Sequence, residues 1–236
     1  KDIRNRLKPM KEWGNIEGSV EYVKCKSIPR DSKLLDIGCN TGSTIFNLHQ
    51  YGFMNVYGVD VEKNSINQGR KIYTQISDRL VDYDGVKLPF EDNSFDVVTM
   101  FDVIEHITNI DEFIREEVRR VLKEYGILLF QTPNKYTNIP WEIFIHKSLH
   151  KYKEYHVSLQ SYRSLISLLE NSGFDEIVIE KRDVCTPYYL RELGKYLGPL
   201  AYPTLFIANK LPTSWTTNFW GYCRAKTEPK GYVHIS

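Results

Sequence analysis

The run LLDIGCNTG at residues 34–42 has the composition of a strand that ends in a ligand-binding turn. Its apolar start ends near Asp36, and Gly38 and Gly42 then frame a tight turn before a helix. Glycine has no Cβ and tolerates a positive φ, so a ligand can lie against bare backbone in such a turn. Asp60 ends a second strand-like run, where a carboxylate can accept hydrogen bonds from both hydroxyls of a ribose. Together these residues predict a site for a nucleoside-containing cofactor.

A second set of residues could act on an acceptor. Asp102, Glu105 and His106 have i, i+3 and i+4 spacing, which places their side chains on one face if the segment is helical. Two carboxylates and an imidazole suit a divalent metal such as Mg, Mn, Fe or Zn. A histidine with a pKa near neutrality could instead take the proton from a weakly nucleophilic hydroxyl, and His156 is a candidate for this base.

The spacing of the glycines distinguishes between cofactor classes. A dinucleotide fingerprint needs Gly-x-Gly-x-x-Gly, and a Walker phosphate loop needs a lysine after its last glycine. Neither pattern is present, because three residues separate Gly38 from Gly42 and no lysine follows. The run instead resembles the first motif of class I S-adenosylmethionine-dependent methyltransferases, acid-x-Gly-x-Gly-x-Gly, with Asn40 at the middle glycine. Asparagine is the non-glycine residue most at ease in a left-handed conformation, so we expect the turn to form.

Later segments extend the resemblance in the right order. Residues 84–98, DGVKLPFEDNSFDVV, resemble the family's later signature, in which the acid at Asp84 meets the adenine amino group and the amide of Gly85 meets a ring nitrogen. Residues 101–107, FDVIEHI, resemble the segment after the fourth strand in the ubiquinone-biosynthesis-type branch.

The resemblance covers residues 31–183 and, weakly, a last strand near residues 219–226. It implies S-adenosylmethionine as the cofactor and S-adenosylhomocysteine as the product. Cys39 is then expected to contact the cofactor through its backbone rather than to act as a nucleophile. The residues expected to hold the cofactor are Asp36, Gly38, Cys39, Asn40, Gly42, Asp60, Val61, Asp84, Gly85 and Phe101.

The resemblance also bears on a metal. An acid-x-x-Glu-His spacing is similar to the metal site of some ubiquinone-type O-methyltransferases and of small-RNA 2′-O-methyltransferases, which implies Asp102, Glu105 and His106 as ligands. In the RNA enzymes a later histidine completes the site, and His156 matches it best here. Those enzymes usually have Glu in the first position, so Asp102 reaches less far. The alternative is that Glu105 caps a helix and His106 lines the pocket uncharged, with His106 and His156 as the catalytic candidates.

Composition limits the class of protein. A chain of 236 residues with 42% hydrophobic residues suits one large domain with a real core. The net charge of +1 produces no global field toward nucleic acid or an anionic membrane. Four cysteines without a CxxC pair favour reduced thiols and a cytoplasmic location. We expect no signal peptide and no transmembrane segment, and the oligomeric state stays open.

Strand-like runs alternate with helical ones along the chain, which predicts a doubly wound α/β fold with right-handed crossovers. The resemblance implies a mostly parallel seven-stranded sheet with an antiparallel last strand, the Rossmann-like methyltransferase fold. Ligands bind at the carboxyl ends of such strands. The expected strands are 32–39, 55–60, 79–83, 95–101, 127–132, 176–180 and 219–226, and the expected helices are 16–26, 42–51, 63–75, 111–123 and 159–171.

We predict that residues 1–236 form a single methyltransferase domain with two extra segments, 134–158 and 185–216, as an acceptor-side cap. The second segment could equally be a satellite hydrophobic cluster or a subunit contact. Its apolar run at 196–211 is too short and too broken by proline to cross a bilayer, but it could lie on a membrane surface or receive a lipid tail. Trp13 could close over the cofactor.

The predicted activity is S-adenosylmethionine-dependent O-methylation of a small molecule, a sugar or a lipid-linked intermediate. RNA 2′-O-methylation is a second hypothesis, against which the near-neutral charge argues. A cofactor-binding partner subunit without catalysis is a third. N-methylation and C-methylation stay open, because these enzymes share their cofactor motifs and a fold does not determine the acceptor.

Overall fold

The structure of this protein is a computed structural model that describes residues 15–150, 152–182 and 187–226. Trp13 and the start of the second cap segment, Cys185 included, lie outside these residues. A seven-stranded sheet in the described part of the chain has the order β3-β2-β1-β4-β5-β7-β6. The strands are β1 Leu34–Ile37, β2 Val56–Asp60, β3 Leu80–Asp82, β4 Phe95–Phe101, β5 Leu122–Pro133, β6 Phe174–Glu180 and β7 Asn218–Ala225.

Strand β7 runs antiparallel to both β5 and β6, and the other neighbouring pairs are parallel. The predicted doubly wound sheet with an antiparallel last strand is therefore confirmed. All residues of β1 are buried without alternation, because helices cover both faces of the sheet.

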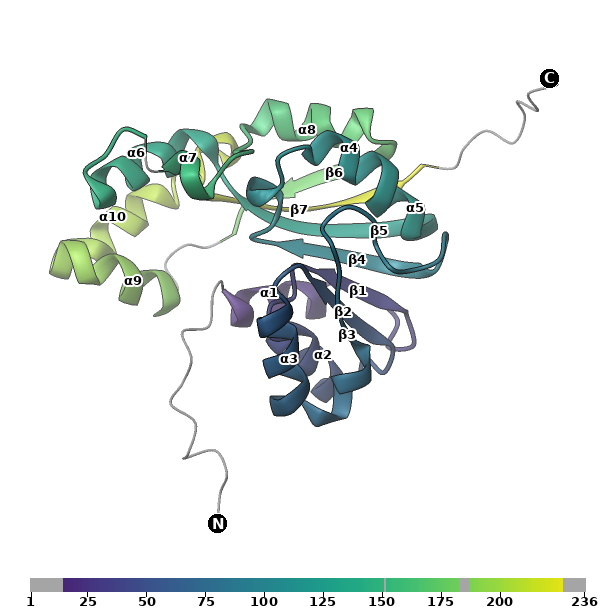
Figure 1. Cartoon of the computed structure of the whole chain (residues 1–236). Helices are drawn as coiled ribbons and strands as arrows, with labels where there is room; N and C mark the ends of the chain where they lie inside the picture. The colour runs from purple at the N-terminus through teal and green to yellow at the C-terminus, as the bar shows by residue number, and fades with distance from the viewer. Residues whose placement is uncertain (1–14, 151, 183–186, 227–236) are drawn as a thin grey trace, which may run out of the picture.

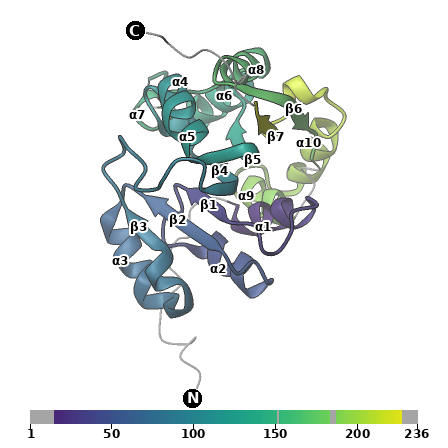
Figure 2. The same ribbon diagram turned by 90° about the vertical axis from the view of Figure 1, so that its right-hand side faces the viewer.

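The helices form a layer on each face of the sheet, as Figure 1 and the turned view in Figure 2 show. The first layer holds α1 Ile16–Lys24, α2 Ser43–Gln50 and α3 Lys63–Ile72, whose buried residues share one core cluster. The second holds α4 Ile110–Phe113, α5 Arg119–Val121 and α8 Tyr162–Asn171, which pack on the other cluster. Each layer buries an apolar stripe against the sheet, as in other open α/β folds.

Two predicted helices end earlier than expected. Helix α3 ends at Ile72, and residues Thr74–Arg79 form a 3₁₀ turn instead of its last residues. The helix expected over 111–123 is α4 and α5 joined by a π turn, Ile114–Val118, and it ends at Val121. The backbone is extended at Leu122, which is buried and pairs with Phe95, so tertiary pairing overrides local helix preference there.

The cap segments gather at one end of the sheet (Figure 1). Helices α6 Lys135–His146 and α7 Tyr152–Tyr155 follow β5, while α9 Pro187–Leu197 and α10 Ala201–Ala208 follow β6. Buried Asn134 ties the two segments together, because its side-chain amide donates to the carbonyls of Ser214 and Thr216 at 3.0 and 2.8 Å. Within the described residues no helix has both the length and the apolar character needed to cross a bilayer.

Candidate active site

The turn after β1 has the predicted left-handed backbone. Gly38, Asn40 and Gly42 have φ values of 75°, 51° and 83°, so Asn40 adopts the conformation expected from its residue type. A Cβ on Gly38 would lie 2.4 Å from Cγ2 of Val103. Glycine is therefore required at Gly38 both for its φ and for the close approach of the segment that follows β4. This approach brings the turn against the start of the segment that carries the predicted acceptor residues.

Asp60 connects the end of β2 to this turn. Its Oδ2 accepts a hydrogen bond from the backbone amide of Asn40 at 2.7 Å, and its Oδ1 accepts one from the amide of Glu62 at 2.8 Å. Each carboxylate oxygen can accept more than one hydrogen bond, so the carboxylate retains acceptor capacity for a ligand hydroxyl. The two amide contacts hold the carboxylate in a single orientation beside the turn.

Two predicted residues at the first turn are buried beneath it. Asp36 is 4% exposed, and Thr99 donates a hydrogen bond from its hydroxyl to Oδ1 at 2.5 Å. Burial raises the pKa of Asp36 to about 7 despite this hydrogen bond. Burial also raises the pKa of the Cys39 thiol, which argues against a nucleophilic thiolate. Sequence reasoning missed Thr99, because a lone threonine in a strand has no distinctive local pattern.

The predicted adenine segment lies at the surface. Asp84 is exposed, and its Oδ1 accepts hydrogen bonds from the amides of Val86 and Lys87 at 2.9 and 3.2 Å, which lower the pKa of the carboxyl. Gly85 has a φ of 81°, and a Cβ there would lie 3.3 Å from Cγ1 of Val61. The structure thus brings the loops after β2 and β3 into contact.

Phe101, the last predicted cofactor residue, ends β4 and packs on the layer of α1. Its ring lies edge-on to Tyr22 with centroids 6.3 Å apart and tilted against Trp220 at 5.8 Å. The ring therefore lies among the aromatic side chains of this layer at the end of β4.

The common face predicted for Asp102, Glu105 and His106 is wrong. Asp102 has a φ of 55°, and the 3₁₀ turn begins only at Ile104 and ends at His106. The Asp102 carboxyl is instead hydrogen-bonded by the side chain of Gln131 and the backbone of Asn15, and burial raises its pKa. A left-handed residue redirects the chain before the turn starts, so i, i+3 spacing does not align these side chains.

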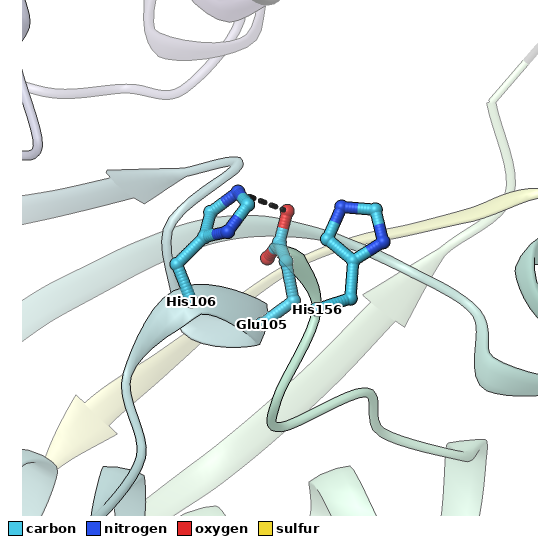
Figure 3. Close-up of side chains that lie close together, drawn as sticks. All are labelled: Glu105, His106 and His156. Atoms are coloured by element: carbon cyan, nitrogen blue, oxygen red, sulfur yellow. Dashed lines mark ion pairs between the residues drawn. The ribbon is translucent and has the colours of Figure 1, made fainter. Parts of the chain in front are cut away.

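The tertiary structure groups Glu105 and His106 with His156, the later histidine expected to complete the site, and leaves Asp102 out of the group. One potential ligand atom from each lies within 4.8 Å of the others. Figure 3 shows the Glu105 carboxylate between the two imidazole rings, and the dashed line marks His106 Nε2 at 3.8 Å from Glu105 Oε1. The ring centroids of His106 and His156 are 5.1 Å apart. The backbone amide of Ser158 donates to the carbonyl of Glu105 at 3.0 Å and so holds the His156 loop against the turn.

Glu105 is 1% exposed and does not cap a helix, contrary to the alternative expected from the sequence. Its Oε2 accepts a hydrogen bond from the hydroxyl of Thr132 at 2.9 Å. Burial, and secondly the nearby charge of Asp102, raise the pKa of Glu105 to about 8. At neutral pH this carboxyl is therefore mostly protonated when no cation is near it.

His156 is half-buried in the loop after α7. Its Nδ1 lies 3.9 Å from Oε1 of Glu142 and has no hydrogen-bond partner among the described residues. Burial, and secondly the neighbouring His106, lower the pKa of His156, so its imidazole is neutral at pH 7. Oε2 of the same Glu142 lies 3.1 Å from Nε2 of His146. Sequence reasoning missed Glu142, although its i, i+4 spacing to His146 on a helix was a usable signal.

Comparison with known proteins places a methyltransferase domain at residues 35–130 of this chain. The chain is 28% identical over 147 residues to the ubiquinone biosynthesis O-methyltransferase of Pelagibacter ubique, covering 57% of this chain and 59% of the relative. It is 35% identical over 127 residues to sterol 4-C-methyltransferase strm-1 of Caenorhabditis elegans, covering 50% and 37%. The chain thus spans between about a third and three fifths of the length of these curated relatives.

Solved structures share the fold at low identity. Phosphoethanolamine N-methyltransferase 2 of Haemonchus contortus, solved with S-adenosyl-L-methionine, matches with a TM-score of 0.63 at 19% identity, over 90% of this chain and 53% of that one. The [4+2]-cyclase SpnF matches with a TM-score of 0.65 at 18% identity, over 90% and 81%. A cyclase and a methyltransferase on one fold illustrate that the site, not the fold, decides the reaction.

Proposed function

We propose that this chain, which carries the domain of class I S-adenosylmethionine-dependent methyltransferases, methylates a hydroxyl oxygen of a small, sugar or lipid-linked acceptor. The observation that carries the proposal is the pair of imidazoles, His106 and His156, beside a segment that packs on the cofactor turn. A hydroxyl is a weak nucleophile while protonated, so its methylation needs a group that takes the proton. Relatives named for C-, N- and O-methylation share the cofactor domain, so the residues on the acceptor side have to determine which kind of atom is methylated.

The residues of the turn fit the cofactor. S-Adenosylmethionine supplies a methyl group already activated on a sulfonium, so the protein has to align the acceptor and remove its proton. Asp60 is held by two backbone amides and would accept hydrogen bonds from the ribose hydroxyls. Gly38 would present bare backbone to the cofactor. Asp84 and Gly85 would contact the adenine from the loop after β3, which meets Val61 from the loop after β2.

His156 is the proposed general base. Its lowered pKa keeps the imidazole neutral and able to accept a proton at pH 7. Glu142 lies 3.9 Å from Nδ1, and a shift of roughly 0.7 Å would make this contact a hydrogen bond. Such a bond would keep a proton on Nδ1 and leave Nε2 to accept the proton of the acceptor hydroxyl. His106 is about half exposed and would contact the acceptor from the other side of Glu105.

A divalent metal is the alternative to a free base at this position. One carboxylate and two imidazoles are a donor set for Zn, Fe or Mn, and the chemistry supplied would be a lowered pKa of the acceptor hydroxyl. Ligand atoms around tetrahedral zinc lie roughly 3.4 Å apart, given bonds of about 2.1 Å. The three side chains would therefore draw together from within 4.8 Å, and Glu105 would lose its proton. Thr132 and Glu142 would then orient Glu105 and His156 from behind.

The test is transfer of labelled methyl from S-adenosylmethionine into a fractionated cell extract, sorted into RNA, lipid, glycan, protein and small molecules. Label in a lipid, glycan or small-molecule fraction that survives mild base and is absent with His156→Ala supports the proposal. The matched control is His150→Ala, an exposed histidine in the same cap segment. Label in RNA alone, or no label from protein shown to bind the cofactor, would refute this acceptor class. Calorimetric titration with Zn²⁺, in the wild type and in Glu105→Gln, decides between metal and free base.

A further inference from the structure

We propose that helix α10 and the turn before it dock on the surface of an anionic lipid bilayer. The docking face is formed by Tyr196, Leu200, Tyr202, Phe206 and Ile207, which are all at least half exposed. Leu200 and Ile207 are the most exposed of these, at 64% each. Large apolar side chains gathered on one short stretch of surface differ from the scattered exposed residues that any protein shows.

The face is held outward by the packing of its other side. Ala201 and Leu205 of α10 are buried, so the helix is attached to the cap while Tyr202, Phe206 and Ile207 point away from it. The ring of Tyr196 in α9 meets Trp141 of α6 edge-on with centroids 5.4 Å apart. The docking face is therefore carried by packed helices, and its exposure is part of the fold.

The charges around the face match an anionic surface. No charged residue occurs between Lys195 and Lys210, and both lysines are exposed, one at each end of this stretch. Nζ of Lys210 lies 5.2 Å from the centroid of the Phe206 ring, so a cation stands beside the apolar surface. Lys195 pairs with Glu192 at 2.5 Å, and Arg191 lies next to the same carboxylate, which leaves a positive balance at that end. Tyrosines are enriched at membrane–water interfaces, and lysines beside an apolar surface can reach the lipid headgroups with their charged ends.

The dimensions of the face favour a bilayer over a second copy of the chain. An eight-residue helix is about 12 Å long and about 10 Å wide, whereas a stable interface buries about 800 Å² on each partner. Docking on a bilayer does not require an interface of that area, because an interfacial helix inserts its apolar face only about 5–10 Å, roughly the depth of side chains.

The position of the docking face determines where the acceptor side of the candidate active site would lie when the protein is docked. Segments α6–α7 and α9–α10 follow β5 and β6 at the edge of the sheet where the parallel strands end (Figure 1). Docking through α10 would place the acceptor side of the site near the membrane, where a lipid-linked acceptor resides. The docking itself does not depend on methyl transfer, so the two proposals can fail separately.

The experiment is co-sedimentation of the full chain with vesicles of phosphatidylcholine alone and of phosphatidylcholine with phosphatidylglycerol. We expect binding to the anionic vesicles and little to the neutral ones. The double variant F206S/I207S should lower this binding by about tenfold or more, since it removes two apolar anchors. K210E should weaken binding to anionic vesicles alone. The matched control is M54S, because Met54 is exposed before β2 and outside the cap.

Each outcome bears on the proposal. The proposal is overturned if the wild type binds neither vesicle type. It is also overturned if F206S/I207S binds the anionic vesicles as well as the wild type does. A wild-type dimer that F206S/I207S dissociates, seen by sedimentation equilibrium, would also overturn it, because a second copy then covers the face. If the double variant does not fold, L200S tests the same face from the 3₁₀ turn. Retained S-adenosylmethionine binding in a variant that has lost vesicle binding separates this proposal from the proposed function.

Discussion

The imidazole of His156 lies beside that of His106, with ring centroids 5.1 Å apart, although the two residues come from different parts of the chain. Glu105 lies between them, buried and bound to Thr132. The same segment reaches the turn after β1 through Val103, whose side chain occupies the space that a Cβ on Gly38 would take. This continuity of contacts joins the predicted donor side to the predicted acceptor side.

Replacing His156 with Ala should lower turnover by about 10²- to 10⁴-fold and leave cofactor affinity unchanged, since a general base acts only on the acceptor. In the wild type, burial lowers the pKa of His156, so the acid limb of kcat/KM should lie below the ordinary histidine value of about 6.5. Steady-state kinetics across pH measure the turnover of the variant and the position of the acid limb in the wild type. Unchanged turnover in His156→Ala, with His150→Ala as control, would remove this residue from the mechanism.

Replacing Asp60 with Ala should weaken S-adenosylmethionine binding by about 1.5–3 kcal/mol, the scale of a hydrogen bond to a charged group. The amide of Asn40 also loses its acceptor, so the turn itself should loosen. Isothermal titration calorimetry measures the affinity. Asp82→Ala is the matched control, because Asp82 ends the neighbouring strand and pairs with Arg70 and Lys63 near the surface. Equal affinities in the two variants would place the ribose elsewhere.

Replacing Gly38 with Ala should destabilise the fold by about 1–3 kcal/mol, because the residue has a φ of 75° and its new Cβ would clash with Val103. Gly52→Ala shares the positive φ, but none of the described residues has an atom within 4 Å of the added Cβ, so it isolates the backbone strain. Urea unfolding measures the free energy of unfolding of Gly38→Ala and Gly52→Ala. We expect Val103→Ala to recover part of the loss in a double variant, and no recovery would mean that strain alone is responsible.

Stability should fall as pH rises between about pH 5 and pH 8 through Glu105. Its pKa is raised to about 8 in the folded protein from an ordinary 4.5, so the folded state binds a proton that the unfolded state has released. The stabilisation is full below the unfolded pKa and is lost as pH rises through the folded one. One such proton changes the unfolding free energy by about 1.4 kcal/mol per pH unit. Glu105→Gln, an uncharged isostere, should flatten this slope in urea titrations, and an identical slope would contradict the raised pKa.

Local signals in the sequence were sufficient for most of the framework. The alternation of strand-like and helical runs predicted the succession of strands and helices along the chain, and the glycine spacing predicted the turn after β1. Asn40 could be assigned a left-handed conformation because its side chain tolerates that region of φ. Boundaries failed where tertiary pairing decided them, as at Leu122, where β5 begins without a connecting loop.

The acceptor side shows where local information ends. Spacing placed Asp102 with Glu105 and His106, but a single left-handed residue at Asp102 changes the direction of the chain. Thr132 could not be assigned to the site from the sequence, because its partner Glu105 is distant in the chain. For Glu142 the sequence offered only the i, i+4 spacing to His146, and its proximity to His156 depends on the tertiary structure.

Sequence alone therefore determined the fold class, the left-handed turn after β1 and the acidic residue at the end of β2, because these depend on short-range backbone preferences and hydrophobic periodicity. Only the tertiary structure decided that Asp102 is left out of the group formed by Glu105, His106 and His156, that Glu105 is buried with a raised pKa, and that α10 turns Phe206 and Ile207 outward. Those relationships arise from how layers pack on the sheet, and packing joins residues that no local pattern connects.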